Sequence, residues 1–140
     1  MKIIGFNYTK ILAERLKPIL KSGMNTDVRV LEVKKEESSM LKGLDAASLT
    51  FVYHLTYNNQ EKKEDKLGEI KLEGNILISL SQEESKELFK LWKKKEVPSV
   101  MQLPIFNFIL RKCTLKAMII QDELGLPSNV SMPKLSAQKQ

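Results

Sequence analysis

The sequence is short of the residues that build disulfides and membrane spans. Cys113 is its only cysteine, so no internal disulfide can form. No apolar run approaches the roughly 20 residues that a membrane-spanning helix needs. Met1–Gly5 has one lysine and a very short apolar patch before polar residues follow, which predicts no secretory signal. These absences predict a protein of the reducing cytoplasm that does not insert into a membrane.

The sequence also has a single histidine and no glycine-rich loop, and both facts bear on catalysis. His54 is the only histidine, and it falls on the face of a predicted strand opposite Phe51 and Tyr53, which favours a structural role. No Cys/His pair has zinc-site spacing, and the six glycines are scattered rather than gathered in a phosphate-binding loop. The carboxylates mostly alternate with lysines. The sequence therefore predicts a binding protein with no catalytic residue, metal or cofactor, rather than an enzyme.

Arginine is the third shortage, and it decides how the net charge of +6 is interpreted. Only three of the 23 basic residues are arginine, the residue preferred for bidentate contacts to bases and phosphates. The densest basic run, Lys93–Lys95, follows an amphipathic stretch, where cations complement the C-terminal end of a helix. A solvated, lysine-rich surface is therefore favoured over a nucleic-acid site.

What the sequence does contain, in its first half, is strand patterning. Residues 49–57 alternate between the two faces of a strand and are rich in aromatic and β-branched side chains. Residues 67–80 alternate over a longer stretch, and the polar residues 58–66 between them predict a hairpin with an exposed tip. Gly74 falls on the apolar face, where a bulge, a bend or the close approach of a helix is expected. One polar face along the longer strand predicts an antiparallel sheet covered on one side only.

Two further strands are expected upstream. Residues 28–33 predict a shorter strand whose alternation slips at Leu31, as at a β-bulge. Residues 9–20 are compatible with a helix or a strand, because apolar side chains at helical spacing are interrupted by Pro18. We favour a strand over about residues 3–15.

The second half of the chain begins with a helix signal. Ser81 and Glu84 have the spacing of a capping box, in which each side chain bonds the backbone N–H of the other residue. An apolar stripe ending at Trp92 follows, and the lysine run and Pro98 end the predicted helix.

A second, longer helix is predicted from about Pro104, which suits a first turn, to about Leu124, with Gly125 as the C-terminal stop. At about 100° per residue its apolar side chains fall into two stripes. The broad stripe contains Phe106, Ile109, Leu110, Cys113, Ala117, Ile120 and Leu124, and the narrow stripe contains Phe108, Leu115 and Ile119. A helix that packs only on its own sheet needs one apolar face. The narrow stripe is therefore expected to be covered by the first helix, through Leu88 or Trp92, by another subunit or by a ligand.

Two prolines mark the residues after the long helix. Pro127 and Pro133 flank a short stretch of mixed polarity, which predicts an extended segment. Residues 1–135 are expected to form one domain, and residues 136–140 a polar, disordered tail.

In this order the elements resemble the SecB-like protein-export chaperone family, particularly its small archaeal-type members. The resemblance rests on LGEIKLEGNILISL, EESKELFKLWKKKEVP, PIFNFILRKCTLKAMII and LPSNVSMPKL, and it covers most of the chain after about Leu49. It implies an α+β fold in which a four-stranded antiparallel sheet carries two C-terminal helices on one face. It also implies dimers or tetramers, assembled through the long helix and the sheet edges. The implied function is ATP-independent holding of unfolded or precursor polypeptides in apolar grooves. The extended segment after the long helix is then expected to lie along the fold and to wall part of a groove.

Two features limit what the resemblance implies. Bacterial exporters dock a motor ATPase through an acidic sheet surface, whereas the polar strand face here mixes Glu69, Lys71 and Glu73. Motor docking is therefore not expected, and export, antitoxin rescue and general holding all stay open. A homo-oligomeric binding module for a specific protein or RNA partner, sharing only the fold, is the alternative function.

Client contacts are expected from apolar residues in three places: a polar loop before the third strand, the connection between the helices, and the long helix. Methionine suits adaptable contacts of this kind. Plain packing is the alternative for each residue. The candidates are Met40, Leu41, Leu44, Val97, Val100, Met101, Leu103, Phe106, Phe108, Leu115 and Ile119.

Overall fold

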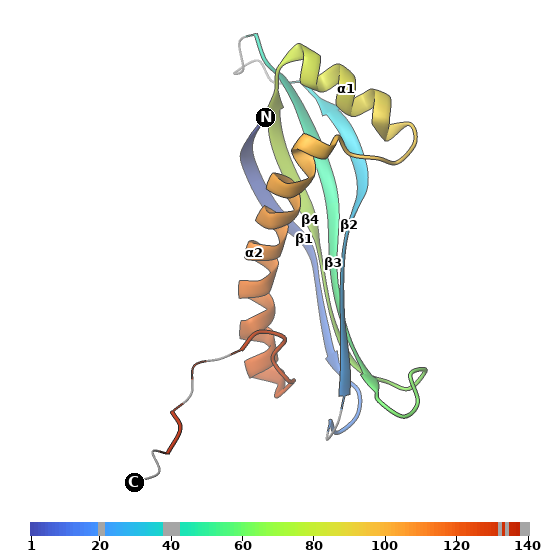
Figure 1. Ribbon diagram of the computed structural model, residues 1–140, viewed down its shortest axis with the longest axis vertical. Coiled ribbons are helices and arrows are strands. Elements are labelled where there is room, and N and C mark those ends of the chain that lie inside the picture. The colour runs from blue at the N-terminus through green and yellow to red at the C-terminus, as the bar shows by residue number, and fades with distance from the viewer. Residues whose placement is uncertain (20–21, 38–42, 132, 134, 138–140) are drawn as a thin grey trace.

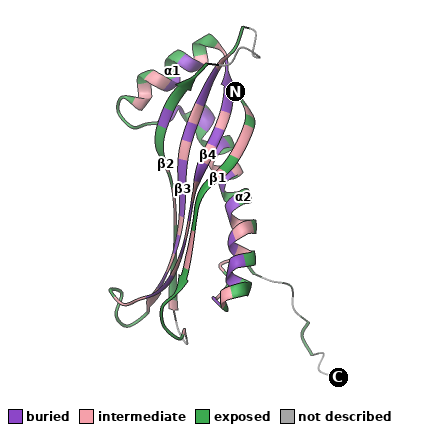
Figure 2. Cartoon of the chain, turned by 180° about the vertical axis from the view of Figure 1, so that it is seen from behind, coloured by how far each residue is buried: buried purple, intermediate pink, exposed green. Residues whose placement is uncertain are grey.

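The structure, a computed structural model, describes residues 1–19, 22–37, 43–131, 133 and 135–137, and over these the chain forms a four-stranded antiparallel sheet and two helices (Figure 1). The order across the sheet is β1-β4-β3-β2. The elements are β1 (Lys2–Arg15), β2 (Ser22–Glu36), β3 (Asp45–Asn59), β4 (Lys66–Leu80), α1 (Gln82–Trp92) and α2 (Ser99–Leu124). Both helices lie on the same face of the sheet, which confirms the expected α+β architecture (Figures 1 and 2).

The predicted hairpin forms the centre of the sheet. Strands β3 and β4 pair along their whole length, and they carry most of the buried residues, whereas β1 and β2 are largely exposed or half-buried (Figure 2). On the open face, His54 Nε2 lies 2.7 Å from Glu69 Oε2, and Lys66 Nζ lies 2.6 Å from Glu69 Oε1. Burial opposes ionisation of Glu69, but the two partners outweigh it and lower the pKa of this carboxyl. His54 therefore takes part in a cluster of hydrogen-bonded polar side chains on the sheet.

Strand β2 is longer than the predicted 28–33. It pairs with β3 from Ser22, opposite Asn59, to Glu36, opposite Ala46. Its first residues are polar and include a glycine, so local preference alone did not indicate a strand there. The ladder of hydrogen bonds to β3 overrides that weak preference, because strand formation depends strongly on the neighbouring strand.

The remaining strand predictions are confirmed. Strand β1 covers the favoured range 3–15, so the helical alternative for this segment is wrong. The pairing of β2 with β3 shifts register between Val30 and Glu32, which is the bulge expected at Leu31.

Among the glycines, Gly74 has the closest neighbours. A Cβ at this position would lie 2.2 Å from the Asn7 carbonyl oxygen and 2.9 Å from Phe51 Cζ. The Phe51 ring therefore lies across the glycine, and it stacks on Phe6 with 5.5 Å between ring centroids. The pairing of β1 with β4 shifts register directly after the Tyr8–Gly74 pair, which agrees with the bulge that the sequence suggested. The close neighbours belong to strands, so the close helix approach is not observed.

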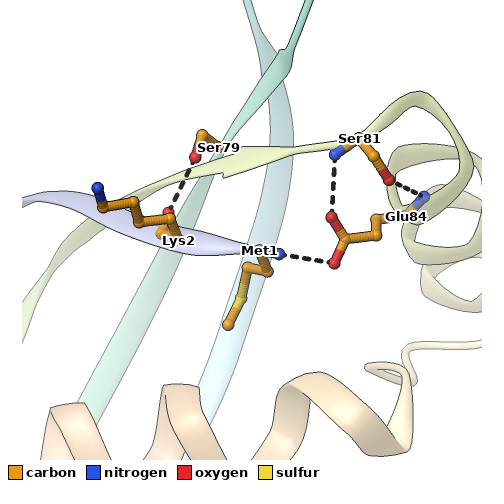
Figure 3. Close-up of polar contacts among 5 residues, drawn as sticks. All are labelled: Met1, Lys2, Ser79, Ser81 and Glu84. Carbon is orange, nitrogen blue, oxygen red and sulfur yellow. Dashed lines mark hydrogen bonds and ion pairs between the residues drawn. The ribbon is translucent and has the colours of Figure 1, made fainter.

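Helix α1 begins at the predicted capping box (Figure 3). The Glu84 N–H donates to Ser81 Oγ at 3.2 Å, and the Ser81 N–H donates to Glu84 Oε1 at 3.0 Å. The amino group of Met1 donates to Glu84 Oε2 at 2.7 Å (Figure 3). This amino group, followed by the Ser81 backbone, lowers the pKa of Glu84. One carboxylate thus joins the start of β1 to the start of α1.

Helix α2 begins five residues earlier than predicted, because Ser99 rather than Pro104 opens it. Pro104 lies inside the helix, where it removes one backbone hydrogen bond. The extra turn buries Met101, whose N–H donates to the Pro98 carbonyl oxygen at 2.9 Å. Packing of that side chain offsets the lost bond. The helix ends as predicted, with Gly125 in the left-handed conformation at φ 64°.

The core lies between the helices and the sheet. Cys113 is fully buried there, as its place in the broad stripe predicted, and burial raises the pKa of its thiol to about 12. Leu110 departs from the prediction for that stripe, because it is 39% exposed at the margin of the helix–sheet interface. The side of α2 that faces the sheet consists of Met101, Ile105, Ile109, Cys113, Ala117, Ile120 and Gln121.

Candidate functional site

A groove of about 440 Å³ lies between strand β2, the end of α1 and the start of α2. Its apolar lining comes from three elements that are distant in the sequence. Val28 and Val30 belong to β2, Trp92 ends α1, and Val97 and Phe106 belong to the helix connection and to α2. Charged residues border it, with Arg29 and Lys95 opposed by Glu96.

The pairing of β2 explains why its valines face the groove. Val28 lies opposite Tyr53 and Val30 opposite Phe51, and both aromatic residues belong to the buried, helix-covered face of β3. In the sheet of the described residues, β2 is an edge strand. An edge strand presents backbone N–H and C=O groups that have no partner strand. The groove is therefore apolar on its floor and lies beside an unpaired strand edge.

The turn after α1 sets the far wall of the groove. The Lys95 N–H donates to the Trp92 carbonyl oxygen at 2.8 Å, and Glu96 donates to that of Leu91 at 3.1 Å. This pair of bonds ends the helix with Lys95 in the left-handed conformation, at φ 60°. Its ammonium group lies 4.9 Å from the centre of the Trp92 ring, a cation–π contact. A lysine thus covers one side of the chain's only tryptophan.

A different surface lies on the other side of α2, next to β1. Phe108 packs edge-on against Phe6, with ring centroids 5.6 Å apart, and Tyr8 Oη donates to the Lys112 carbonyl oxygen at 3.2 Å. Leu115 and Ile119 continue the narrow stripe and are 59% and 55% exposed. Strand β1 is the other edge of the sheet. An apolar patch therefore lies beside each edge strand.

The idea that α1 covers the narrow stripe is wrong. Leu88 is buried in the core, and Trp92 lines the groove on the β2 side of α2. Leu115 and Ile119 keep more than half of their surface exposed in the single chain. Two alternatives remain for what covers the narrow stripe, another subunit and a ligand.

The structure separates the predicted client residues into several places. Val97 and Phe106 come together in the groove. Met101 is 1% exposed and offers no surface in this conformation. Val100 and Leu103 lie on the solvent side of the first turns of α2, at 73% and 71% exposure.

The other candidates lie away from the groove. Phe108, Leu115 and Ile119 lie on the β1 side of α2, so they share no surface with Val97 and Phe106. Leu44 is exposed just before β3. Met40 and Leu41 lie outside the described residues.

Sequence reasoning missed three groove residues, Val28, Val30 and Trp92. Their signals were present, since the two valines share one face of a predicted strand and Trp92 is the only tryptophan. What the sequence did not show is that β2 is an edge strand lying beside the helix connection. That neighbourhood depends on the strand order.

The segment after α2 lies along the fold, as the family resemblance implied. Leu126 is buried, and Tyr57 Oη donates to the Pro127 carbonyl oxygen at 2.6 Å. Asn129 Nδ2 donates to Tyr53 Oη at 3.1 Å. Burial raises the pKa of both tyrosines, so their hydroxyl groups stay protonated at neutral pH. Leu135 is fully exposed.

The described residues also bear on other functions. They contain no group of three or more His, Cys, Asp or Glu residues that could hold a metal ion. None of the helices in the described part of the chain combines the length and the apolar character that crossing a membrane requires.

Comparison with known proteins bears on the fold. No protein-family model and no curated protein matches the sequence. Among solved structures, the chain is similar to the Mycobacterium tuberculosis Rv1957 SecB-like chaperone in complex with a ChAD peptide from the Rv1956 HigA1 antitoxin. The identity is 14%, the match covers 99% of this chain and 92% of that chain, and the TM-score is 0.50. The chain therefore has a SecB-like fold.

Proposed function

We propose that this protein is an ATP-independent holdase chaperone that binds unfolded or precursor polypeptides. The observation that carries the proposal is the apolar groove beside the open edge of β2. The fold supports it, because the similar Mycobacterium tuberculosis structure is that of a SecB-like chaperone with a peptide from an antitoxin.

The groove suits an extended polypeptide of variable sequence. The edge of β2 offers backbone hydrogen-bonding groups that any extended segment can pair with. The apolar floor then buries client side chains, at about 25 cal/mol per Å² of apolar area. Backbone pairing and apolar burial are both tolerant of sequence, and neither needs a nucleotide. Several short apolar segments of one unfolded chain can bind several grooves, which raises the overall affinity.

Among the predicted client residues, we assign Val97 and Phe106 to the groove itself. Leu103 precedes Phe106 by three residues and Val100 precedes Leu103 by three, so the exposed pair extends the apolar surface by about two helical turns. Trp92 joins this set because it lines the same groove.

We propose that a second copy of the chain covers the β1 side. The edge of β1 and the exposed Leu115 and Ile119 lie on that side, away from the groove. A dimer built there leaves both β2 grooves free, and pairing of dimers would give a tetramer. We place this assembly in the cytoplasm, where the single buried thiol of Cys113 stays reduced.

Suppression of aggregation tests the proposal. Several unrelated unfolded proteins are diluted from denaturant with and without the chaperone, in the absence of nucleotide, and light scattering is recorded. We expect suppression by the wild type, and weaker suppression by Phe106→Ala, which removes an aromatic ring from the groove. Phe89→Ala is the matched control, because Phe89 is also half-buried but lines a different cavity, between α1 and the end of β2.

The outcomes separate the candidate functions. Equal loss in both variants would remove the groove from the mechanism, and no suppression of any client would refute the holdase. Binding to RNA with a steep salt dependence would instead favour the specific-partner module.

A further inference from the structure

One side of α2 leads from the groove toward the segment that follows the helix. Phe106, Leu110 and Gln121 lie within about 60° of one another around the helix axis, on its β2 side. Leu110, between the other two, is 39% exposed, so this side of the helix is open to solvent there. On the sheet, Val28 of the groove lies directly opposite Tyr53 in the adjacent strand. The helix and the sheet therefore both lead from the groove to Tyr53.

At that point the chain's own C-terminal segment begins to cover the sheet. We define the strap as residues Leu126–Val130. Asn129 donates to Tyr53 Oη at 3.1 Å and accepts from Gln121 Nε2, also at 3.1 Å. Tyr57 Oη donates to the Pro127 carbonyl oxygen at 2.6 Å. These contacts leave Tyr53 and Tyr57 fully buried.

The strap binds through groups that other polypeptides also possess. A backbone carbonyl, a side-chain amide and one buried leucine make its contacts with the sheet and with Gln121. Val130, at its end, is already exposed. Gln121 Oε1 is buried without a hydrogen-bond donor among the described residues, so the site keeps an acceptor that a backbone N–H of another chain would satisfy.

We propose that the strap competes with client polypeptides within the same chain. It covers the part of the client surface nearest Tyr53, and a polypeptide long enough to reach Tyr53 displaces it. This inference rests on the proposed function. A short segment fills only the groove between Trp92 and Phe106 and leaves the strap in place. A longer segment must open the strap first, so its apparent affinity is lowered by the fraction of molecules whose strap is closed. The strap thus discriminates between short and long unfolded segments.

Peptide length and one strap substitution test the competition. Two fluorescein-labelled peptides of leucine, valine and serine are used, with 6 and 16 residues, spanning at most about 20 and 55 Å when extended. Binding is followed by anisotropy and by the fluorescence of Trp92. Asn129→Ala removes both Asn129 contacts without altering the groove lining. Leu135→Ala is the control, because Leu135 is fully exposed and lies beyond the strap.

The expected result is a length-dependent gain. The 16-residue peptide should bind Asn129→Ala about three- to tenfold more tightly than wild type, because weaker hydrogen bonding opens the strap more often. The 6-residue peptide should bind both proteins alike, and Leu135→Ala should match wild type. In wild type, saturation with the long peptide should speed hydrogen exchange of the Leu126 amide, which donates to the Gln121 carbonyl oxygen.

The other possible outcomes refute either the competition by the strap or the proposed function. If the long peptide binds wild type and Asn129→Ala equally, or leaves the Leu126 amide protected at saturation, the strap is a fixed part of the fold and the competition is refuted. If the affinity of both peptides rises equally in Asn129→Ala, the substitution acts on the groove between Trp92 and Phe106, and the inference is also refuted. If neither peptide binds any of the proteins, the proposed function fails and the competition with it.

Discussion

The exposed part of the narrow stripe gives the sharpest prediction about assembly. The double substitution Leu115→Asp/Ile119→Asp should convert the protein to monomers while leaving its fold intact. The two side chains are 59% and 55% exposed, so the single chain loses little packing when they change. Phe108 is unsuitable for this experiment, because its ring packs against Phe6 and a carboxylate there would unsettle the fold.

The magnitude follows from the area left to bury. Full burial of a leucine or isoleucine contributes about 1.5–3 kcal/mol, so the exposed halves contribute about 1.3 kcal/mol each. A two-fold dimer contains four such side chains, which together contribute about 5 kcal/mol. At about 1.4 kcal/mol per decade, their loss raises the dimer dissociation constant by three to four powers of ten, before the cost of burying carboxylates is added.

Sedimentation velocity across about 1–100 μM protein measures the effect. Val100→Asp/Leu103→Asp is the matched control, because these side chains are at least as exposed but lie on the other part of the helix. The control should keep the wild-type mass and weaken client binding instead. A wild type that is already monomeric at every concentration, or equal masses for both double variants, would refute the assignment of this surface to a second copy.

Two further predictions concern the fold. Gly74→Ala should destabilise the fold by about 3 kcal/mol or more and lower Tm by roughly 10 °C, because its Cβ would lie 2.2 Å from the Asn7 carbonyl oxygen. Gly23→Ala is the control, and with its nearest atom at 3.9 Å it should change stability by less than about 0.5 kcal/mol. Equal effects of the two substitutions would show that the close contact at Gly74 does not determine stability. Burial raises the pKa of Cys113 from 9.0 to about 12, so the neutral thiol favours the folded state fully below pH 9 and this stabilisation is lost as the pH rises to about 12. In denaturant titrations at pH 8–11, the free energy of unfolding should begin to fall at pH 9 in wild type. In Cys113→Ala it should begin to fall only at about pH 10, where the buried tyrosines begin to contribute. The same onset in both proteins would contradict the attribution of the fall to Cys113.

Local features of the fold were predictable because their causes lie within a few residues. The capping box needs only Ser81 and Glu84, and the left-handed end of α2 needs only Gly125. The alternation in 49–57 and 67–80 predicted the central hairpin, because a two-residue period and a polar connection specify neighbouring antiparallel strands. Prediction failed where distant packing outweighed local preference. Helix α2 continues through Pro104, and β2 extends into a polar segment.

The candidate site divides in the same way. The sequence by itself determined that the long helix has more apolar surface than one sheet requires, since helical periodicity is set by residue spacing. Only the tertiary structure decided where that surface lies. The strand order places β2 at one edge beside Trp92 and Phe106, and β1 at the other beside Leu115 and Ile119. Which strands become edges depends on pairing across the whole chain, and no local pattern of side chains encodes it.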